Sequence, residues 1–288
     1  TLDGPLYDRV EQLIGNYSDK GYPLKDLAWI LMGLTSVDLN SAQALSSSFN
    51  LAELVAASES EPHLGKIGSF IWSLWKLDKS TAHELMQRLD SKYFSDRILN
   101  EPDVARIGWF LDRASIANKL AAKSFITIDN GVILARRIDE MLPTDSLSAL
   151  LRGIGSSNLE AATTVLREIG LEQIQNRLRN ESNNLWVGYL LLAISDIDNL
   201  FGKQVSAAIT NSRVSSSVSA QKEYYGAAVL LAGIKSADPQ RGQALIESEI
   251  EVINAFHAEA LDNVRMFSTM CVGAMDQAQR LANSLASL

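Results

Sequence analysis

The segment IGSFIWSLWKLD at residues 67–78 recurs in altered form as IGWFLDRASIAN at residues 107–118. Both segments begin with Ile-Gly, and they lie 40 residues apart. Further steps of 40 residues, with no insertion or deletion, reach four more copies: LAWILMGLTSVD (27–38), LSALLRGIGSSN (147–158), VGYLLLAISDID (187–198) and AAVLLAGIKSAD (227–238). A fixed period of this length is the sequence signature of a repeat architecture. The period therefore predicts that the fold is built from one repeated structural unit of about 40 residues.

Apolar residues recur in each copy at a spacing that places them on one face of an α-helix. In the second copy these residues are Ile67, Phe70, Ile71 and Leu74. An adjacent position is always small, and its members are Ala28, Gly68, Gly108, Ser148, Gly188 and Ala228. Glycine inside a helix costs about 1 kcal/mol relative to alanine. We therefore expect the backbone of a neighbouring helix to approach closely at this position.

The last position of each copy is Asp or Asn, and the six residues are Asp38, Asp78, Asn118, Asn158, Asp198 and Asp238. Short side chains of this kind accept the free N–H groups in the first turn of a helix. Pro239 follows Asp238, and proline is favoured at the first helical position. The pattern predicts that these residues are structural N-caps of a second helix. A ladder of metal ligands is the alternative, and capping accounts for every member without it.

A shorter apolar segment, such as KYFSDRIL at residues 92–99, and a polar loop complete each unit. Each repeat should thus contain two main helices and a short third helix. The predicted repeats are residues 24–63, 64–103, 104–143, 144–183, 184–223 and 224–263, with partial units at 1–23 and 264–288. One unit cannot cover its own apolar faces, so successive units must stack. We therefore predict an all-α fold, an α-solenoid of about six repeats that forms one elongated domain over residues 1–288.

The gapless 40-residue repeat with two main helices and a short third resembles the HEAT and armadillo α-solenoids over nearly the whole chain. The IGSFIWSLWKLD opening, followed by AHELMQRLD at residues 82–90, is also similar to helical repeats that form the sensor region of prokaryotic signal-transduction NTPases. The resemblance implies a sensing or scaffolding segment of a larger protein. No glycine-rich phosphate loop that ends in Lys-Ser or Lys-Thr occurs here, so an NTPase module would lie outside this sequence.

The composition narrows the expected partners. The 288 residues carry a formal charge of -8, which disfavours binding to nucleic-acid phosphates. The longest apolar runs are shorter than the roughly 20 residues that a membrane span requires, so no membrane association is expected. Cys271 is the single cysteine, which is typical of a protein from a reducing compartment. We expect a cytoplasmic protein that needs no metal or cofactor.

Catalytic motifs are not evident in the sequence. It contains no nucleophile elbow, zinc-ligand spacing or dinucleotide fingerprint. Its histidines are His63, His83 and His257, and a His-Glu pair occurs once, at His83-Glu84, whereas HEAT-like metal hydroxylases carry several such pairs. Cys271 falls in an apolar column and is expected to be a small core residue. We therefore predict that the chain is not an enzyme.

Two groups of residues are candidates for partner binding. Arg97, Arg137 and Arg177 recur at the repeat spacing in the third segment, and stacking should align them in a row. Either acidic neighbours, the loop residues Glu61, Glu101 and Glu181, neutralise the row, or an acidic partner does. Arginine suits carboxylate capture because its planar fork binds two oxygens. Trp72 and Trp75 lie off the apolar stripe, so each either packs against a neighbouring unit or anchors a partner.

The sequence favours a non-catalytic solenoid that binds a protein or peptide, possibly an acidic one, or that serves as a scaffold. A HEAT-like enzyme, of the DNA-repair glycosylase or metal hydroxylase type, is one alternative, and a purely structural spacer is another. A binding module should carry a charged or aromatic surface. An enzyme should carry a deep pocket with isolated carboxylates, and a spacer should carry neither.

Overall fold

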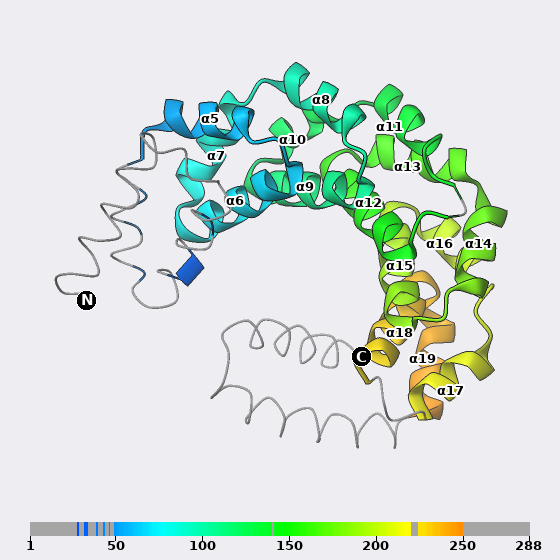
Figure 1. Cartoon of the computed structure of the whole chain (residues 1–288). Helices are drawn as coiled ribbons and strands as arrows, with labels where there is room; N and C mark the ends of the chain where they lie inside the picture. The colour runs from blue at the N-terminus through cyan, green and yellow to red at the C-terminus, as the bar shows by residue number, and fades with distance from the viewer. Residues whose placement is uncertain are drawn as a thin grey trace. The chain divides into compact units, whose positions relative to one another are not determined.

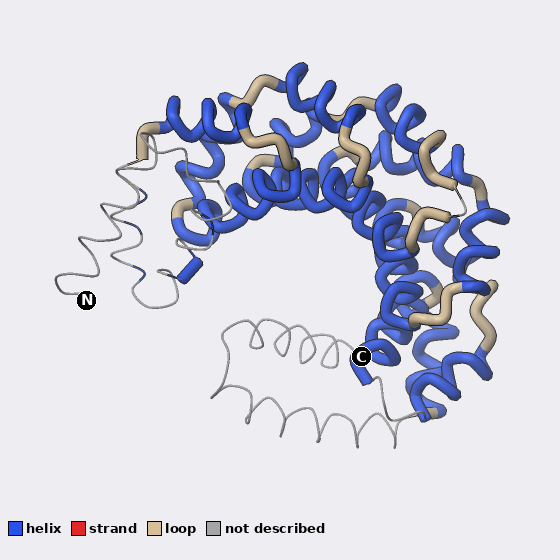
Figure 2. Tube along the Cα trace, viewed as in Figure 1, coloured by secondary structure: helices blue, strands red, loops and turns tan. Residues whose placement is uncertain are grey.

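The computed structural model of the chain describes residues 49–139, 141–219 and 224–249, together with six single positions between residues 28 and 46. These residues form fifteen helices, α5 to α19, joined by short loops, and no strand occurs among them (Figure 2). The all-α class predicted from the sequence is therefore confirmed. None of the described helices has both the length and the hydropathy that a membrane crossing requires.

The helices follow the period of the sequence. The first helices of successive repeats begin 40 residues apart and end 40 residues apart: α6 (Leu64–Leu77), α9 (Val104–Ala117), α12 (Thr144–Ser157), α15 (Asn184–Ile197) and α18 (Tyr224–Ala237). The second helices are α7 (Lys79–Arg88), α10 (Lys119–Phe125), α13 (Leu159–Ile169), α16 (Asn199–Ser206) and α19 (Pro239–Ser248). The third helices are α5 (Leu51–Ser60), α8 (Ser91–Asn100), α11 (Ile128–Ala135), α14 (Leu171–Asn180) and α17 (Asn211–Ser219).

The junction between first and second helices is set by the Asp/Asn position. The carboxylate of Asp78 accepts hydrogen bonds from the backbone N–H groups of Ser80 and Thr81 at 2.9 and 3.1 Å. The same residue ends α6: its N–H donates the last helical hydrogen bond to the carbonyl of Leu74, and its extended backbone (φ -142°, ψ 98°) stops the helix there. Corresponding side-chain caps are made by Asn118, Asn158, Asp198 and Asp238. Asp38 lies outside the described residues.

The chain divides into two compact units. The first consists of residues 1–134 and 152–162, and the second of residues 135–151 and 163–288. Helices α12 and α13 contribute residues to both units. The single elongated domain and the solenoid arrangement of the complete chain stay predictions, and each unit is described here by itself.

In the first unit, equivalent helices of adjacent repeats pack together. Helix α6 contacts α9, α7 contacts α10, and the third helix α8 packs against α10. The second helices α7 and α10 lie between the pair α6 and α9 and the pair α5 and α8 (Figure 1). Three fully buried rings from different helices, Phe94, Phe110 and Phe125, meet with centroids 5.4–5.8 Å apart. This aromatic cluster joins the three helix layers.

In the second unit, α15 packs along α18 through the small position of the repeat. A Cβ built on Gly188 would lie 2.6 Å from the backbone nitrogen of Leu230 in α18. Real Cβ atoms do not approach so closely, so only glycine allows the two helices this contact. In the first unit, a Cβ on Gly68 would lie 3.0 Å from the Cα of Phe110. The close helix approach expected from the small residues is thus present in both units.

Candidate functional site

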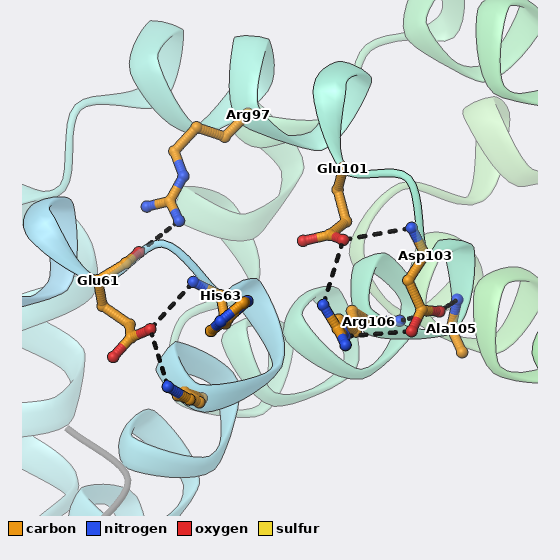
Figure 3. Close-up of polar contacts among 8 residues, drawn as sticks. Glu61, His63, Arg97, Glu101, Asp103, Ala105 and Arg106 are labelled. Atoms are coloured by element: carbon orange, nitrogen blue, oxygen red, sulfur yellow. Dashed lines mark hydrogen bonds and ion pairs between the residues drawn. The ribbon is translucent and has the colours of Figure 1, made fainter. Parts of the chain in front are cut away.

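The first candidate set, the arginine row of Arg97, Arg137 and Arg177, begins in α8. Arg97 reaches back to the preceding repeat and donates to the backbone oxygen of Glu61 at 2.5 Å (Figure 3). It also donates to the backbone oxygen of Ser58 at 3.5 Å. These carbonyls are at the C-terminal end of α5, where helix carbonyls have no intrahelical partner. The guanidinium also lies 5.5 Å from the ring centroids of Tyr93 and Phe94. Arg97 therefore joins two successive third helices.

Arg177 makes the equivalent connection in the second unit. Its two terminal nitrogens donate to the backbone oxygens of Asp139 and Leu142, in the loop that follows α11. Arg137 is half-buried in the turn after α11. Arg97 belongs to the first unit, whereas Arg137 and Arg177 belong to the second. The structure therefore shows two local capping contacts, and partner binding by the row stays a prediction.

Two further arginines cap helix ends in the same manner, although they lie outside the predicted row. The next position of the row, 40 residues after Arg177, is Ser217. Arg213 lies one helical turn before it and donates to the backbone oxygens of Leu178 and Glu181. Arg241 donates to the carbonyls of Ser206 and Ile209 at the end of α16. Burial lowers the pKa of each guanidinium, and a nearby carboxylate partly offsets this shift.

The loop glutamates do not neutralise Arg97 through their carboxylates. The buried carboxylate of Glu61 accepts from the N–H of His63 at 3.0 Å and pairs with Lys66 at 3.5 Å. The carboxylate of Glu101 repeats both contacts 40 residues later, as Figure 3 shows beside Arg97. Each of these glutamates therefore fixes the loop that enters the next first helix. Arg97 donates to the backbone oxygen of Glu61 and not to its carboxylate.

The second candidate pair, Trp72 and Trp75, lies on α6. The two half-buried indoles stack with centroids 5.4 Å apart and planes inclined by 16°. Trp72 follows Gly68, the residue that touches α9, by one helical turn. The pair therefore lies beside the contact between α6 and α9. Each indole packs on the other within the unit and keeps part of its surface accessible, and anchoring of a partner by the pair stays a prediction.

Three cations surround this pair. Lys76 lies 4.7 Å from the ring centroid of Trp72 and Lys79 lies 5.0 Å from that of Trp75. Arg113, from α9, lies 4.2 Å from the centroid of Trp72. A cation over an indole is attracted by the ring quadrupole, by about 0.5–1 kcal/mol at exposed sites. We call these five residues the tryptophan–cation cluster.

Sequence reasoning found the two tryptophans of this cluster and missed its cations. Lys76 follows Trp72 by four residues within α6, the spacing at which side chains of one helix meet, so that spacing could have revealed this lysine. Lys79 begins α7 beyond the cap at Asp78, so helical spacing does not place it beside Trp75. Arg113 comes from the next repeat, and only the packing of α9 on α6 brings it there.

His83 is the one remaining candidate that lies within the described residues. His83 contacts the carbonyl of Ala117 at 3.3 Å and the amide of Asn118 at 3.3 Å, so it helps to join α7 to the end of α9. His257 and Cys271 lie outside the described residues. No group of three or more His, Cys, Asp or Glu side chains suited to a metal ion occurs in the ranges that the structure describes.

Comparisons of the chain with protein-family models, with curated proteins and with solved structures gave no significant match. The function must therefore be argued from the surfaces themselves.

Proposed function

We propose that the chain is a non-catalytic interaction module that binds a protein or peptide on the surface formed by α6 and α9. The proposal assigns it the role of a sensing or scaffolding segment, as its resemblance to helical-repeat sensors implies. Stacked helical repeats offer extended surfaces of this kind.

The observation that carries the proposal is the exposure of Trp109. This residue lies on α9, and 58% of its surface is accessible. Ser69 occupies the equivalent position on α6 and is also exposed. Tryptophan buries a large area with little loss of conformational freedom, and it is enriched among the residues that dominate binding energy at interfaces. A spacer has no need for an indole at this position.

The tryptophan–cation cluster extends this surface. Trp72 and Trp75 lie on α6 beside its contact with α9, and Trp109 projects from α9 of the same unit. Polar and charged groups accompany the indoles, which is the mixture typical of the anchor residues and rim of an interface. This combination supports a binding surface over a spacer.

The test is site-specific photo-crosslinking in a native lysate. A photoreactive amino acid replaces Ser69, and a matched chain carries it at Lys92, an exposed residue of α8. We expect one discrete crosslinked partner from position 69 and none from position 92. Equal labelling from both positions would show that the face of α6 and α9 is not a docking surface.

A variant tests the role of the indole directly. Trp109→Ala should reduce the crosslinked product about tenfold or more if the side chain is an anchor, since anchors contribute about 2 kcal/mol or more. Met141→Ala is the control, because Met141 is 86% exposed in the loop after α11. Crosslinking that survives Trp109→Ala unchanged would contradict the proposal.

A further inference from the structure

The tryptophan–cation cluster gathers three positive side chains around two indoles. Lys76 contacts both rings, with its Nζ atom 4.7 Å from the centroid of Trp72 and 5.8 Å from that of Trp75. Lys79 and Arg113 approach one ring each, at 5.0 and 4.2 Å. The side chains come from α6, from the first turn of α7 and from α9. The cluster thus joins two successive repeats.

Three like charges held this close together repel one another, and the attraction of the indoles offsets part of that repulsion. Lys76 and Lys79 are exposed to solvent. Neither lysine forms an ion pair within the ranges that the structure describes. The chain as a whole carries a charge of -8. A local concentration of positive charge on an acidic protein is therefore a specific feature of this face.

The chemistry of the cluster favours a carboxylate ligand over a stacking one. Trp72 and Trp75 already stack on each other, and their rings also carry the three cations. What the cluster offers to a ligand is therefore N–H donors. Each of the two exposed lysines has three such donors. A nucleobase would need the ring faces that these contacts occupy.

We propose that the tryptophan–cation cluster binds an acidic peptide segment of a partner protein, with Lys76 and Lys79 as the carboxylate-binding groups. The indoles hold the ammonium and guanidinium groups in place before the ligand arrives, which reduces the entropy lost on binding. The inference rests on the proposed interaction function and names its ligand chemistry. It places the acidic partner on α6, α7 and α9 and not on the helices of the arginine row.

The experiment uses the full chain and a fluorescently labelled glutamate-rich peptide, with anisotropy as the readout. A peptide of the same length with glutamine in place of glutamate is the control for charge. We expect the glutamate peptide to bind, the glutamine peptide not to bind, and the affinity to fall as ionic strength rises. The double variant Lys76→Gln/Lys79→Gln should weaken binding about tenfold.

The matched control is Lys92→Gln/Lys123→Gln, which removes the same charge from two exposed lysines on α8 and α10. This control should change the affinity less than about twofold, because exposed charges away from the ligand contribute little. Melting curves of all variants check that the fold persists.

Three results would overturn the inference: no binding of the glutamate peptide at low ionic strength, equal binding by Lys76→Gln/Lys79→Gln, or tighter binding of single-stranded DNA than of the peptide. None of these results affects crosslinking from position 69, which tests the interaction function itself. Loss of that crosslink together with intact peptide binding would instead contradict the proposed function alone.

Discussion

The guanidinium of Arg97 donates a hydrogen bond to the backbone oxygen of Glu61, the residue that ends the third helix one repeat earlier. The contact satisfies a helix-end carbonyl that has no partner within its own helix. Arg177 does the same for the loop after α11, and Arg213 for the end of α14. Capping across repeats is therefore a recurrent means of joining one repeat to the next.

Replacing Arg97 by alanine should lower stability. The change removes charged hydrogen bonds to two carbonyls as well as the contacts with the rings of Tyr93 and Phe94. Hydrogen bonds to a charged group contribute about 1.5–3 kcal/mol, so urea unfolding should show a loss of this order. Arg88→Ala, at an exposed position of α7, should be nearly neutral. Equal stability of the two variants would mean that water satisfies the carbonyls equally well.

The N-cap at Asp78 should contribute measurably to the free energy of unfolding. Asp78→Ala leaves the N–H groups of Ser80 and Thr81 without the acceptor that they have now. We expect a loss of about 0.5–2 kcal/mol in the free energy of unfolding. Metal ions should not alter the melting temperature of either protein. A metal-dependent melting temperature that disappears in Asp78→Ala would show that the Asp/Asn residues bind metal.

The same carboxylate should make stability depend on pH. Burial by itself raises the pKa of Asp78, and hydrogen bonds from the Thr81 hydroxyl, the N–H groups of Thr81 and Ser80, and Ser46 outweigh it, so the pKa lies below its ordinary value of 3.8. A carboxyl with a lowered folded-state pKa stabilises the fold above its unfolded-state pKa, and the contribution disappears as pH falls through the folded-state value.

The charge can be isolated with Asp78→Asn, since asparagine is also a good N-cap. Wild type should exceed this variant in stability at neutral pH, and the difference should diminish below about pH 4. Asp96→Asn, at an exposed position inside α8, serves as the control in parallel urea titrations. A difference that grows on acidification would refute the assigned direction of the pKa shift.

The small position should tolerate no side chain where helices touch. Gly188→Ala places a methyl group against the backbone of Leu230, and overpacking of this kind costs about 1–3 kcal/mol. In Gly65→Ala the nearest atom, the Cγ of Arg106, lies 3.6 Å away in ordinary contact. That variant should be neutral or stabilised by up to about 1 kcal/mol, because alanine favours the helix. Thermal melts that rank the pair in the opposite order would refute the close packing of α15 on α18.

Ser58 offers a stabilising substitution. It is fully buried on α5, and its hydroxyl has no hydrogen-bond partner among the described residues. Ser58→Ala should therefore be neutral or stabilising by about 1 kcal/mol, since an unsatisfied buried hydroxyl is costly. Ser73, buried to the same degree, donates to the carbonyl of Ser69 at 2.9 Å, and Ser73→Ala should instead cost about 0.5–1.5 kcal/mol. A larger loss from Ser58→Ala than from Ser73→Ala would reveal a partner for the Ser58 hydroxyl.

The local organisation of each repeat follows from the sequence because its causes are local. Helix hydrogen bonds join residues four positions apart, so the apolar spacing and the cap at Asp78 set the bounds of α6 and α7 without reference to the rest of the chain. Because these signals recur every 40 residues, α9, α12, α15 and α18 begin and end at the corresponding positions of their repeats. The small residues Gly68 and Gly188 likewise predicted where neighbouring helices meet.

The direction of long side chains was decided by tertiary structure alone. An arginine has several rotatable bonds, so its position in a helix does not determine which partner it reaches. Arg97 turns to the carbonyls of α5, and Arg113 turns to Trp72 of the preceding repeat. Two arginines of the row seen in the sequence, Arg97 and Arg177, consequently make local capping contacts. The positive surface is formed elsewhere, where packing of α9 on α6 places a distant guanidinium beside two lysines and two indoles.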